Sequence, residues 1–307
     1  MMEVCICTFN PRQDVLKLVL RSIAAQTAPS TRFNFLLVDN SSSPPLKVDL
    51  LAPLEARGIK CRLVRDTRAG IFQARNRAMR ESTQPLILWV DDDTELPDHY
   101  VVQCLAIAEA HPEIGCFGGK LLMGPNCRYA KWTVTIHPWL AIIDRGETPI
   151  TNKANHWGLW EPPTAGAVVR RQVIDCYLDF VGKLPSNYVI GQVGNKALLR
   201  GEDSLLMRMA HRVDLACSYQ PSLQVIHHLD NRRFKAAYLF KLFYGYGRSY
   251  VLLEKILGDP LPPMTWREAW TFLWNTRLRK ESANWGIFFV MKAWNLGFIA
   301  ERTIRRA

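Results

Sequence analysis

The first 120 residues alternate between two kinds of hydrophobic pattern. Short, continuous apolar runs with β-branched members predict buried strands. These predicted strands cover residues 3–9, 33–38, 61–64 and 86–90. Between them, apolar residues recur at helical spacing, so the chain is expected to alternate strand and helix. Such alternation, with strands that are apolar throughout, predicts an α/β fold with a mostly parallel sheet flanked by helices.

The predicted helices begin at capping or helix-starting residues. Asn10 and Pro11 predict the start of the first helix, with Asn10 as its N-cap. The apolar stripe of this helix consists of Leu16, Val19, Leu20 and Ile23. Further helices are expected over 71–80, from Pro97 to about Glu109, and over 204–210.

Polar side chains follow three of the predicted strands. In parallel sheets, ligands bind beyond the carboxyl ends of the strands. Here those ends are Thr8-Phe9-Asn10, Asp39-Asn40-Ser41 and Asp91-Asp92-Asp93. The sequence therefore predicts a polar pocket at this edge of the sheet.

Three consecutive acids, Asp91 to Asp93, repel one another unless a cation or water screens them. A divalent ion with oxygen ligands, Mg²⁺ or Mn²⁺, would be held by one or two of these carboxylates together with substrate phosphate oxygens. The alternative is a solvated acidic loop that caps the helix expected at Pro97.

Further polar groups surround the three acids in the predicted fold. Gly70 at a helix start and Arg75 one turn later would favour an anion. Glu202 and Asp203 form a second acidic pair before a helix, and His227-His228 end an apolar strand over 224–226. Together these groups predict a site for metal-assisted transfer, although a histidine at a strand end can also be purely structural.

The charge of the chain is concentrated near its end. Residues 232–307 carry 14 Lys and Arg against 5 Asp and Glu, which is +9 of the total formal charge of +11. Five of the ten tryptophans lie in the same segment. We therefore predict two regions, a catalytic domain over 1–231 and a basic, Trp-rich helical region over 232–307.

This last region predicts a surface for contact. Trp266, Trp270 and Trp274 share one helical face, and cations follow them, which is typical of a helix that lies at a membrane surface. The alternative is that 264–307 packs on the protein's own core or on a second copy, forming a homo-oligomer. The basic patch lacks a helix-turn-helix, RNA-recognition or zinc-finger pattern, so no nucleic-acid partner is expected.

The remaining composition bears on location. The eight cysteines form no C-x-x-C pair, which favours a reducing compartment. No secretion signal is recognised at the start, and no apolar run reaches the ~20 residues that a membrane-spanning helix needs. We predict a cytoplasmic protein, peripheral on the inner face of the cytoplasmic membrane.

A series of motifs resembles family 2 glycosyltransferases, which have the GT-A nucleotide-sugar fold. The resemblance covers roughly residues 3–250 and rests on the order and spacing of its pieces. They are CTFNP at 7–11, VDN at 38–40, G-x-x-x-ARN at 70–76, VDDDTELP at 90–97, PTAGAVVRR at 163–171, GEDSLLMRM at 201–209, P-x-L-x-V-x-HHL at 221–229 and GRS at 247–249.

The resemblance implies a role for each of these polar residues. Thr8 and Asp39 would line the pocket for base and ribose, and Arg75 would sit near the diphosphate or ribose. Asn10, Gly70 and Asp92 are expected in the same nucleotide-sugar site. Asp93 would hold the metal, Mn²⁺ or Mg²⁺, and Asp91 would reach the nucleotide. Asp203 would be the general base with Glu202 as the alternate, and His227, or else His228, would add a metal ligand.

One departure from the family pattern lies after the second strand. Many members have an acidic D-G-S turn where this chain has Asn40-Ser41-Ser42. The change leaves every essential group in place but alters the expected nucleotide pocket.

The expected activity is inverting transfer from a nucleoside-diphosphate sugar, with a UDP-sugar favoured, to a hydroxyl of a glycan or lipid-linked acceptor in cell-surface polysaccharide synthesis. One base attacking opposite the leaving group gives inversion. Within the segment 124–162, His156, Trp157 and Trp160 are expected to cover the acceptor, unless they form a core beneath a loop. The alternatives are a catalytically silent, membrane-associated scaffold and a nucleotidyltransferase.

Overall fold

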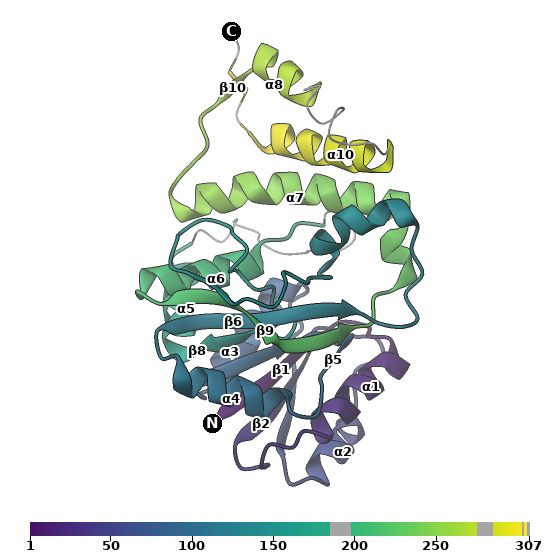
Figure 1. Cartoon of the computed structure of the whole chain (residues 1–307), viewed down its shortest axis with the longest axis vertical. Helices are drawn as coiled ribbons and strands as arrows, with labels where there is room; N and C mark the ends of the chain where they lie inside the picture. Colours follow the sequence, from purple (N-terminus) through teal and green to yellow (C-terminus); the bar gives the residue numbers. More distant parts are fainter. Residues whose placement is uncertain (185–197, 275–284, 303, 306–307) are drawn as a thin grey trace. The chain divides into compact units, whose positions relative to one another are not determined.

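The computed structural model describes residues 1–184, 198–274, 285–302 and 304–305. The chain divides into two compact units. Unit 1 comprises 1–126, 141–187 and 203–229, and unit 2 comprises 127–140, 188–202 and 230–307. Within the described residues, unit 1 contains the large sheet and unit 2 is mainly helical (Figure 1).

Nine strands form one sheet in the described part of unit 1. Their order is β3 (Lys60–Arg65), β2 (Phe33–Asp39), β1 (Met2–Thr8), β4 (Leu86–Val90), β8 (Val168–Arg170), β6 (Ile114–Met123), β9 (Ala216–His227) and β5 (Thr94–Glu95), with β7 (Ile150–Asn152) also paired to β9. The pairs β1–β2, β1–β4, β2–β3 and β6–β9 are parallel, whereas β8, β5 and β7 join antiparallel. The mostly parallel sheet with flanking helices confirms the predicted fold class.

The helices of this unit follow the apolar pattern. They are α1 (Gln13–Ala24), α2 (Ala52–Glu55), α3 (Ile71–Glu81), α4 (Tyr100–Ala110), α5 (Arg171–Gly182) and α6 (Glu202–Arg212), with the 3₁₀ helix η1 (Val48–Leu51). The predicted stripe of α1 is buried and belongs to the same core as β1 and β2. The stripe repeats every three or four residues, so burying it fixes one face of the helix against the sheet.

Two predicted helix starts are wrong. The first helix begins at Gln13 with Arg12 as its N-cap, instead of at Pro11 with Asn10 as its N-cap, and Asn10 has a positive φ of 47°. The amide of Asn10 donates to Ser42 Oγ at 2.9 Å, and its side-chain oxygen accepts from the amide of Ser43 at 2.8 Å. The fourth helix begins at Tyr100 instead of Pro97, after a turn in which the Pro97 carbonyl accepts from the Tyr100 amide at 3.0 Å.

The long parallel pair of β6 and β9 was predicted only at the end of β9. Ser, Gln and Pro residues interrupt the apolar pattern of β9, and the two strands shift register between Gly118 and Lys120. At Gly119 a Cβ atom would lie 1.9 Å from the Leu223 carbonyl oxygen. Only glycine permits this close approach, so the sequence marks the irregularity without revealing the partner strand.

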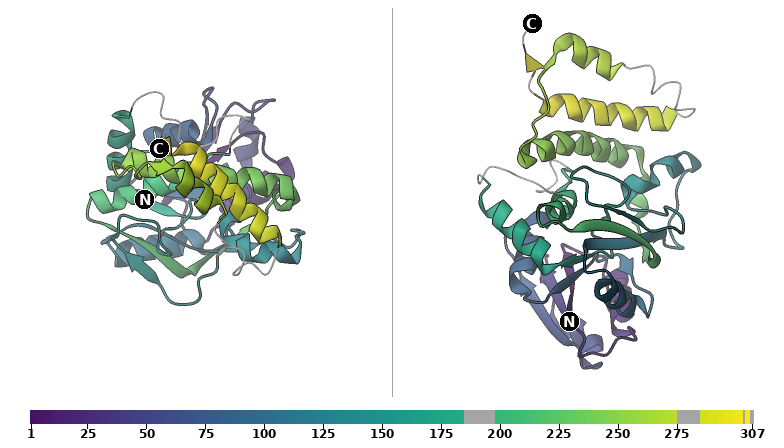
Figure 2. Two further views of the ribbon diagram at one scale, coloured as in Figure 1. Left: turned by 90° about the horizontal axis from the view of Figure 1, so that it is seen from above. Right: turned by 60° about the vertical axis from the view of Figure 1, so that its left-hand side comes forward.

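Unit 2 contains η2 (Lys131–Leu140), η4 (Asn231–Phe234), α7 (Ala236–Leu257), α8 (Trp266–Leu273), α10 (Trp285–Glu301) and the short strands β10 (Met264–Thr265) and β11 (Ile304–Arg305). Helices α7 and α10 lie side by side (Figure 2). Glycines permit their close approach, since a Cβ on Gly247 would lie 2.0 Å from the Trp294 carbonyl oxygen and one on Gly297 would lie 1.9 Å from that of Tyr244. None of the helices described here is both long and apolar enough to span a membrane.

Candidate active site

The ends of β1, β2 and β4 meet as the sequence predicts. Thr8, the last residue of β1, is paired with Asp39, the last residue of β2. The Thr8 hydroxyl donates to the carboxylate of Asp92, which follows β4. Thr8 and Asp39 are buried, whereas Asp91 and Asp92 are partly exposed.

The Asp39 carboxylate organises the loop after β2. Its two oxygens accept from the amide of Ser42 at 2.9 Å and from the amide of Leu46 at 3.1 Å. Burial alone would raise the pKa of Asp39, but these hydrogen bonds and the Ser42 hydroxyl favour the ionised form, and the pKa is lowered. Each oxygen can accept a second hydrogen bond, so both contacts leave room for a nucleotide base. The predicted contact of Asp39 with the nucleotide base stays a prediction.

Gly70 and Arg75 are placed by the loops around α3. Gly70 has a φ of 120°, a conformation that favours glycine, and its amide donates to the side-chain oxygen of Asn40 at 2.8 Å. Arg75 is buried on α3. Its Nη2 donates to Thr164 Oγ1 at 2.6 Å and lies 3.7 Å from Asp91 Oδ1. Arg75 and Asp91, which are both predicted in the nucleotide-sugar site, therefore lie close together.

Asp93 lies beside His227. Antiparallel pairing of β5 with β9 sets Thr94 opposite His227, and Asp93 Oδ1 lies 3.2 Å from His227 Nε2. The His227 Nδ1 contacts the carbonyl oxygen of Ala141 at 2.9 Å. Because a carbonyl oxygen only accepts, Nδ1 donates to Ala141, and Nε2 faces Asp93.

His228 has different surroundings. Its Nε2 lies 2.7 Å from Glu95 Oε2, and its amide donates to the Asp93 carbonyl oxygen at 2.8 Å. Arg12 donates to the carbonyl oxygen of His228, and its Nη2 lies 3.6 Å from Asp93 Oδ2. Only the first of the two histidines therefore directs a ring nitrogen at Asp93. Among the described residues, no three His, Cys, Asp or Glu side chains are grouped so that they could hold a metal ion by themselves.

Glu202 and Asp203 occupy the first two positions of α6. Glu202 is buried, whereas Asp203 is partly exposed. The Asp203 Oδ1 accepts from the amide of Ser204 at 2.9 Å, which holds the carboxylate at the start of the helix. A partly exposed carboxylate at this position can meet a substrate from solvent.

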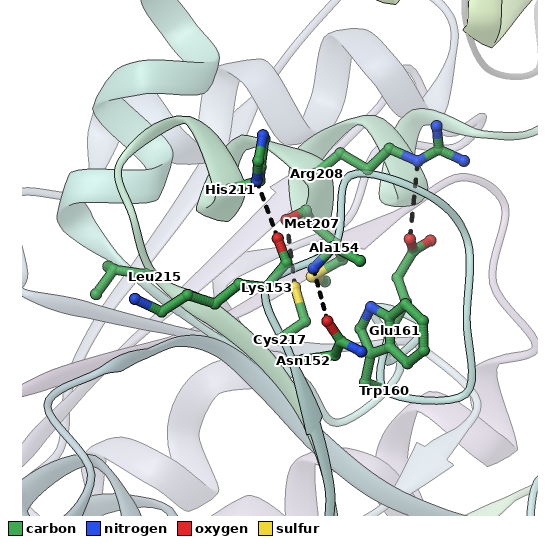
Figure 3. A pocket seen from close by; sticks show the side chains of 10 residues that line it. All are labelled: Asn152, Lys153, Ala154, Trp160, Glu161, Met207, Arg208, His211, Leu215 and Cys217. Atoms are coloured by element: carbon green, nitrogen blue, oxygen red, sulfur yellow. Dashed lines mark hydrogen bonds and ion pairs between the residues drawn. The ribbon is translucent and has the colours of Figure 1, made fainter.

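The aromatic residues expected near the acceptor lie in the segment after β7. The rings of His156 and Trp160 meet edge to face with centroids 5.2 Å apart, and Trp157 is 57% exposed. Trp160 lines a pocket together with side chains of α6 and the start of β9 (Figure 3). The same pocket is lined by Cys217, which lies near the start of β9, whereas His227 is the last residue of that strand. Trp160 and His227 therefore lie toward opposite ends of β9.

Three residues of the site were missed by the sequence reasoning. They are Arg12 beside Asp93, Thr164 beside Arg75, and Glu161, whose carboxylate accepts from Ser204 Oγ at 2.5 Å. Thr164 lies inside the recognised PTAGAVVRR motif, so its position was signalled although its partner was not. Arg12 and Glu161 stand in no local pattern that would reveal their contacts.

Comparisons with known proteins agree with this architecture. The model of the family described as glycosyl transferase family 2 matches residues 3–178, more than half of the chain. No curated protein matches the sequence significantly.

Several solved structures are similar in fold. The S. aureus TarS 1–349 structure aligns with a TM-score of 0.55 at 11% identity, covering 98% of this chain and 89% of that one. The mannosyltransferase PcManGT from Pyrobaculum calidifontis, solved with GDP-Man and Mn²⁺, has a TM-score of 0.55 at 16% identity and covers 95% and 73%. Against the longer S. aureus TarS structure the TM-score is 0.52 at 14% identity, and the match spans 84% of this chain but only 43% of TarS.

The loop held by Asp39 provides a test of stability. We expect Asp39→Asn to lower the free energy of unfolding at pH 7 by about 1–3 kcal/mol, because one buried charge-assisted hydrogen bond is lost. The folded-state pKa of Asp39 is lowered, so its stabilisation is present above the unfolded pKa and lost as pH falls through the folded value. The difference between wild type and variant, measured by urea unfolding, should therefore shrink below about pH 4. The exposed Asp179→Asn is the control, and an equal effect of both variants would contradict the role of Asp39.

Proposed function

The chain belongs to glycosyl transferase family 2, and on that basis we propose that it transfers a sugar from a nucleoside-diphosphate donor to a hydroxyl group with inversion. The pairing of Asp93 with His227 at the carboxyl ends of the strands carries this proposal. A UDP-sugar is the favoured donor, and a glycan or lipid-linked molecule of cell-surface polysaccharide synthesis is the proposed acceptor. S. aureus TarS 1–349, a structure similar in fold, was solved with UDP-GlcNAc.

The donor is proposed to bind along the ends of β1, β2 and β4. Thr8, Asn10 and Asp39 would line the base and ribose, while Gly70 and Arg75 would face the diphosphate. The N-terminus of α3 and the Arg75 guanidinium both favour an anion, and Arg75 is held in place by Thr164. Asp91 and Asp92 would complete the pocket on the nucleotide side.

The groups at Asp93 suit a divalent ion. A carboxylate oxygen and an imidazole nitrogen lie 3.2 Å apart, close enough to bind the same ion, and this ligand pair suits Mn²⁺ better than Mg²⁺, which prefers oxygen. The remaining ligands would be donor phosphate oxygens and water. The Ala141 carbonyl orients His227, as such partners do for metal-binding histidines. A bound ion would act as a Lewis acid that neutralises charge on the leaving diphosphate.

Asp203 is proposed as the general base. The acceptor oxygen forms a bond to the anomeric carbon while the bond from that carbon to the diphosphate oxygen breaks, and the hydroxyl proton passes to the Asp203 carboxylate. Attack opposite the leaving group inverts the configuration. Partial exposure favours Asp203 over the buried Glu202, because the base must come within ~2.6–3.2 Å of an acceptor that enters from solvent.

The acceptor is proposed to lie near His156, Trp157 and Trp160. Aromatic faces stack well on sugar rings, and Trp157 presents an exposed ring. A second feature, in unit 2, favours an acceptor that is made at a membrane.

The second feature is the set of exposed aromatic rings on α8 and α10. Trp266, Trp270 and Trp274 are 64%, 66% and 54% exposed, and Trp285 is 78% exposed. On the opposite side of α8, Ala269 is buried and Phe272 packs on Phe298 with centroids 5.0 Å apart. Indole rings prefer the headgroup level of a bilayer, and the net charge of +9 over 232–307 favours anionic lipid. We therefore propose that 264–307 holds the protein on the inner face of the cytoplasmic membrane.

Donor and metal binding can be measured by thermal unfolding with UDP, GDP, UDP-GlcNAc and GDP-mannose, each with Mn²⁺, Mg²⁺ or chelator. A ligand at 100 times its Kd should stabilise the protein by ~2.7 kcal/mol. We expect a metal-dependent shift with one nucleotide that is lost in Asp93→Asn and in His227→Gln. The neighbouring His228→Gln is the matched control and should keep the shift. The reverse pattern would assign the metal to His228, and no shift with any ligand would contradict the donor site.

The base is tested by Asp203→Asn. We expect its kcat to fall by about 10²–10⁴-fold, while the donor-induced thermal shift is unchanged. Release of nucleoside diphosphate from the donor that binds, with water or an added glycan as acceptor, measures turnover. Glu202→Gln is the comparison that separates the two adjacent acids. If Glu202→Gln loses turnover and Asp203→Asn does not, the base is Glu202. If the wild-type protein binds donor but shows no turnover, the protein is the catalytically silent scaffold.

The membrane surface is tested by sedimentation with phosphatidylcholine vesicles that contain or lack phosphatidylglycerol. We expect binding to the anionic vesicles that weakens at high salt and is lost when Trp266, Trp270 and Trp274 are all changed to Ala. Trp157→Ala removes a comparably exposed ring outside this region and should bind like wild type. Unchanged binding of the triple variant would contradict the proposal, and a shift from dimer to monomer in that variant would show that the rings contact a second copy.

A further inference from the structure

A single short segment connects the donor end of unit 1 with the start of α6. At its C-terminal end, Thr164 accepts a hydrogen bond from Arg75, which in turn lies 3.7 Å from Asp91. At its N-terminal end, Glu161 accepts from Ser204 Oγ, next to Asp203. Residues 161–164 therefore contact both the groups proposed to face the donor and the helix turn that carries the proposed base.

The segment is held firmly along its length. Arg145 donates to the carbonyl oxygens of Leu159 and Glu161, the latter at 3.4 Å. Pro162 packs on β6, where a Cβ on Gly118 would lie 2.9 Å from the Pro162 Cβ. Restrained from both sides, the segment fixes where the Glu161 carboxylate points.

Glu161 itself is a buried carboxylate, only 6% exposed. Its second oxygen, Oε2, lies 3.9 Å from the Nε of Arg208, which is one turn along α6 from Ser204 (Figure 3). Glu161 therefore contacts two residues, Ser204 and Arg208, that lie one turn apart on the same side of α6. Burying a charged group this deeply is costly, so a carboxylate at this position is a poor choice for stability alone.

We propose that Glu161 is a positioning residue for catalysis, which holds the first turn of α6, and with it the Asp203 carboxylate, in register with the donor groups through Ser204. The inference rests on the proposed role of Asp203 as the base. Glu161 acts through Ser204 and does not itself receive the acceptor proton. Placement errors of ~1 Å between reacting groups cost up to about 10²-fold in rate, so a group that sets this placement affects kcat.

The ionisation of Glu161 gives the proposal a pH signature. The pKa of Glu161 is raised to about 7, and burial is the largest cause. The Asp203 carboxylate also raises this pKa, whereas the Ser204 hydroxyl, Arg208 and Arg145 lower it. The Cys116 thiol of β6 also interacts electrostatically with this carboxylate. Above pH 7 the ionised group accepts from Ser204 and attracts Arg208. Below pH 7 the carboxylate takes up a proton and the attraction to Arg208 is lost. Glu161 should then hold α6 less firmly.

The experiment compares wild type with Glu161→Gln, Ser204→Ala and the double variant, using Glu109→Gln as an exposed control. Two quantities are measured for each. They are the thermal shift caused by the bound donor with Mn²⁺, and the kcat for release of nucleoside diphosphate from that donor across pH 6 to 9, with water as acceptor. The thermal shift also shows that each variant is folded.

We expect Glu161→Gln and Ser204→Ala each to lower kcat by about 10- to 100-fold with the donor-induced shift unchanged. The double variant should be no slower than the slower single variant, because both remove the same contact. The wild-type profile should show an inflection near pH 7 that Glu161→Gln lacks.

Three results would overturn the inference: a kcat within about twofold of wild type in Ser204→Ala, multiplicative losses in the double variant, or an inflection near pH 7 that persists in Glu161→Gln. If Glu161→Gln does not fold, Ser204→Ala, whose side chain is only partly buried, decides the outcome by its kcat. A wild type that releases no nucleotide from any bound donor would overturn the proposed function itself, and is thereby distinguished from a failure at Glu161.

Discussion

The site of this protein depends on one antiparallel pairing, that of the two-residue strand β5 with the end of β9. It sets Thr94 opposite His227, residues that are 133 positions apart in the chain. Asp93, directly before β5, is thereby brought within 3.2 Å of His227. Asp92 and Asp91 have partners of their own in Thr8 and Arg75, so of the three acids Asp93 is the one that depends on this pairing for its neighbour.

The same pairing separates two histidines that are equivalent in sequence. His227 ends β9 and His228 follows it, and the ring nitrogen of His227 lies near Asp93 while that of His228 lies near Glu95. Arg12 stabilises the position of Asp93 beside the end of β9, because it donates to the carbonyl oxygen of His228 and lies close to the Asp93 carboxylate. Tertiary contacts therefore distinguish two histidines that are neighbours in sequence.

Glycines allow close packing in both units, of strands in unit 1 and of helices in unit 2. In unit 1, glycines such as Gly119 let strands approach closely, and in unit 2, Gly247 and Gly297 do so for helices α7 and α10. The large aromatic residues of unit 2 divide between the two sides of α8, with Phe272 packed inward and the three tryptophans exposed. Exposed indole rings are costly in water, which is the physical reason to seek a surface that covers them.

The sequence by itself determined the strands β1 to β4, the apolar face of α1, and the polar character of the strand ends, because these features repeat locally with the period of a strand or helix. It also identified the family through the order of its motifs. Only the tertiary structure decided the start of α1, where Asn10 bonds to the loop at Ser42, and the long pairing of β6 with β9 across a shift in register. The contacts of Arg12, Glu161 and Thr164 were likewise decided by folding, since each joins segments far apart in the chain and no local pattern encodes a partner at that distance.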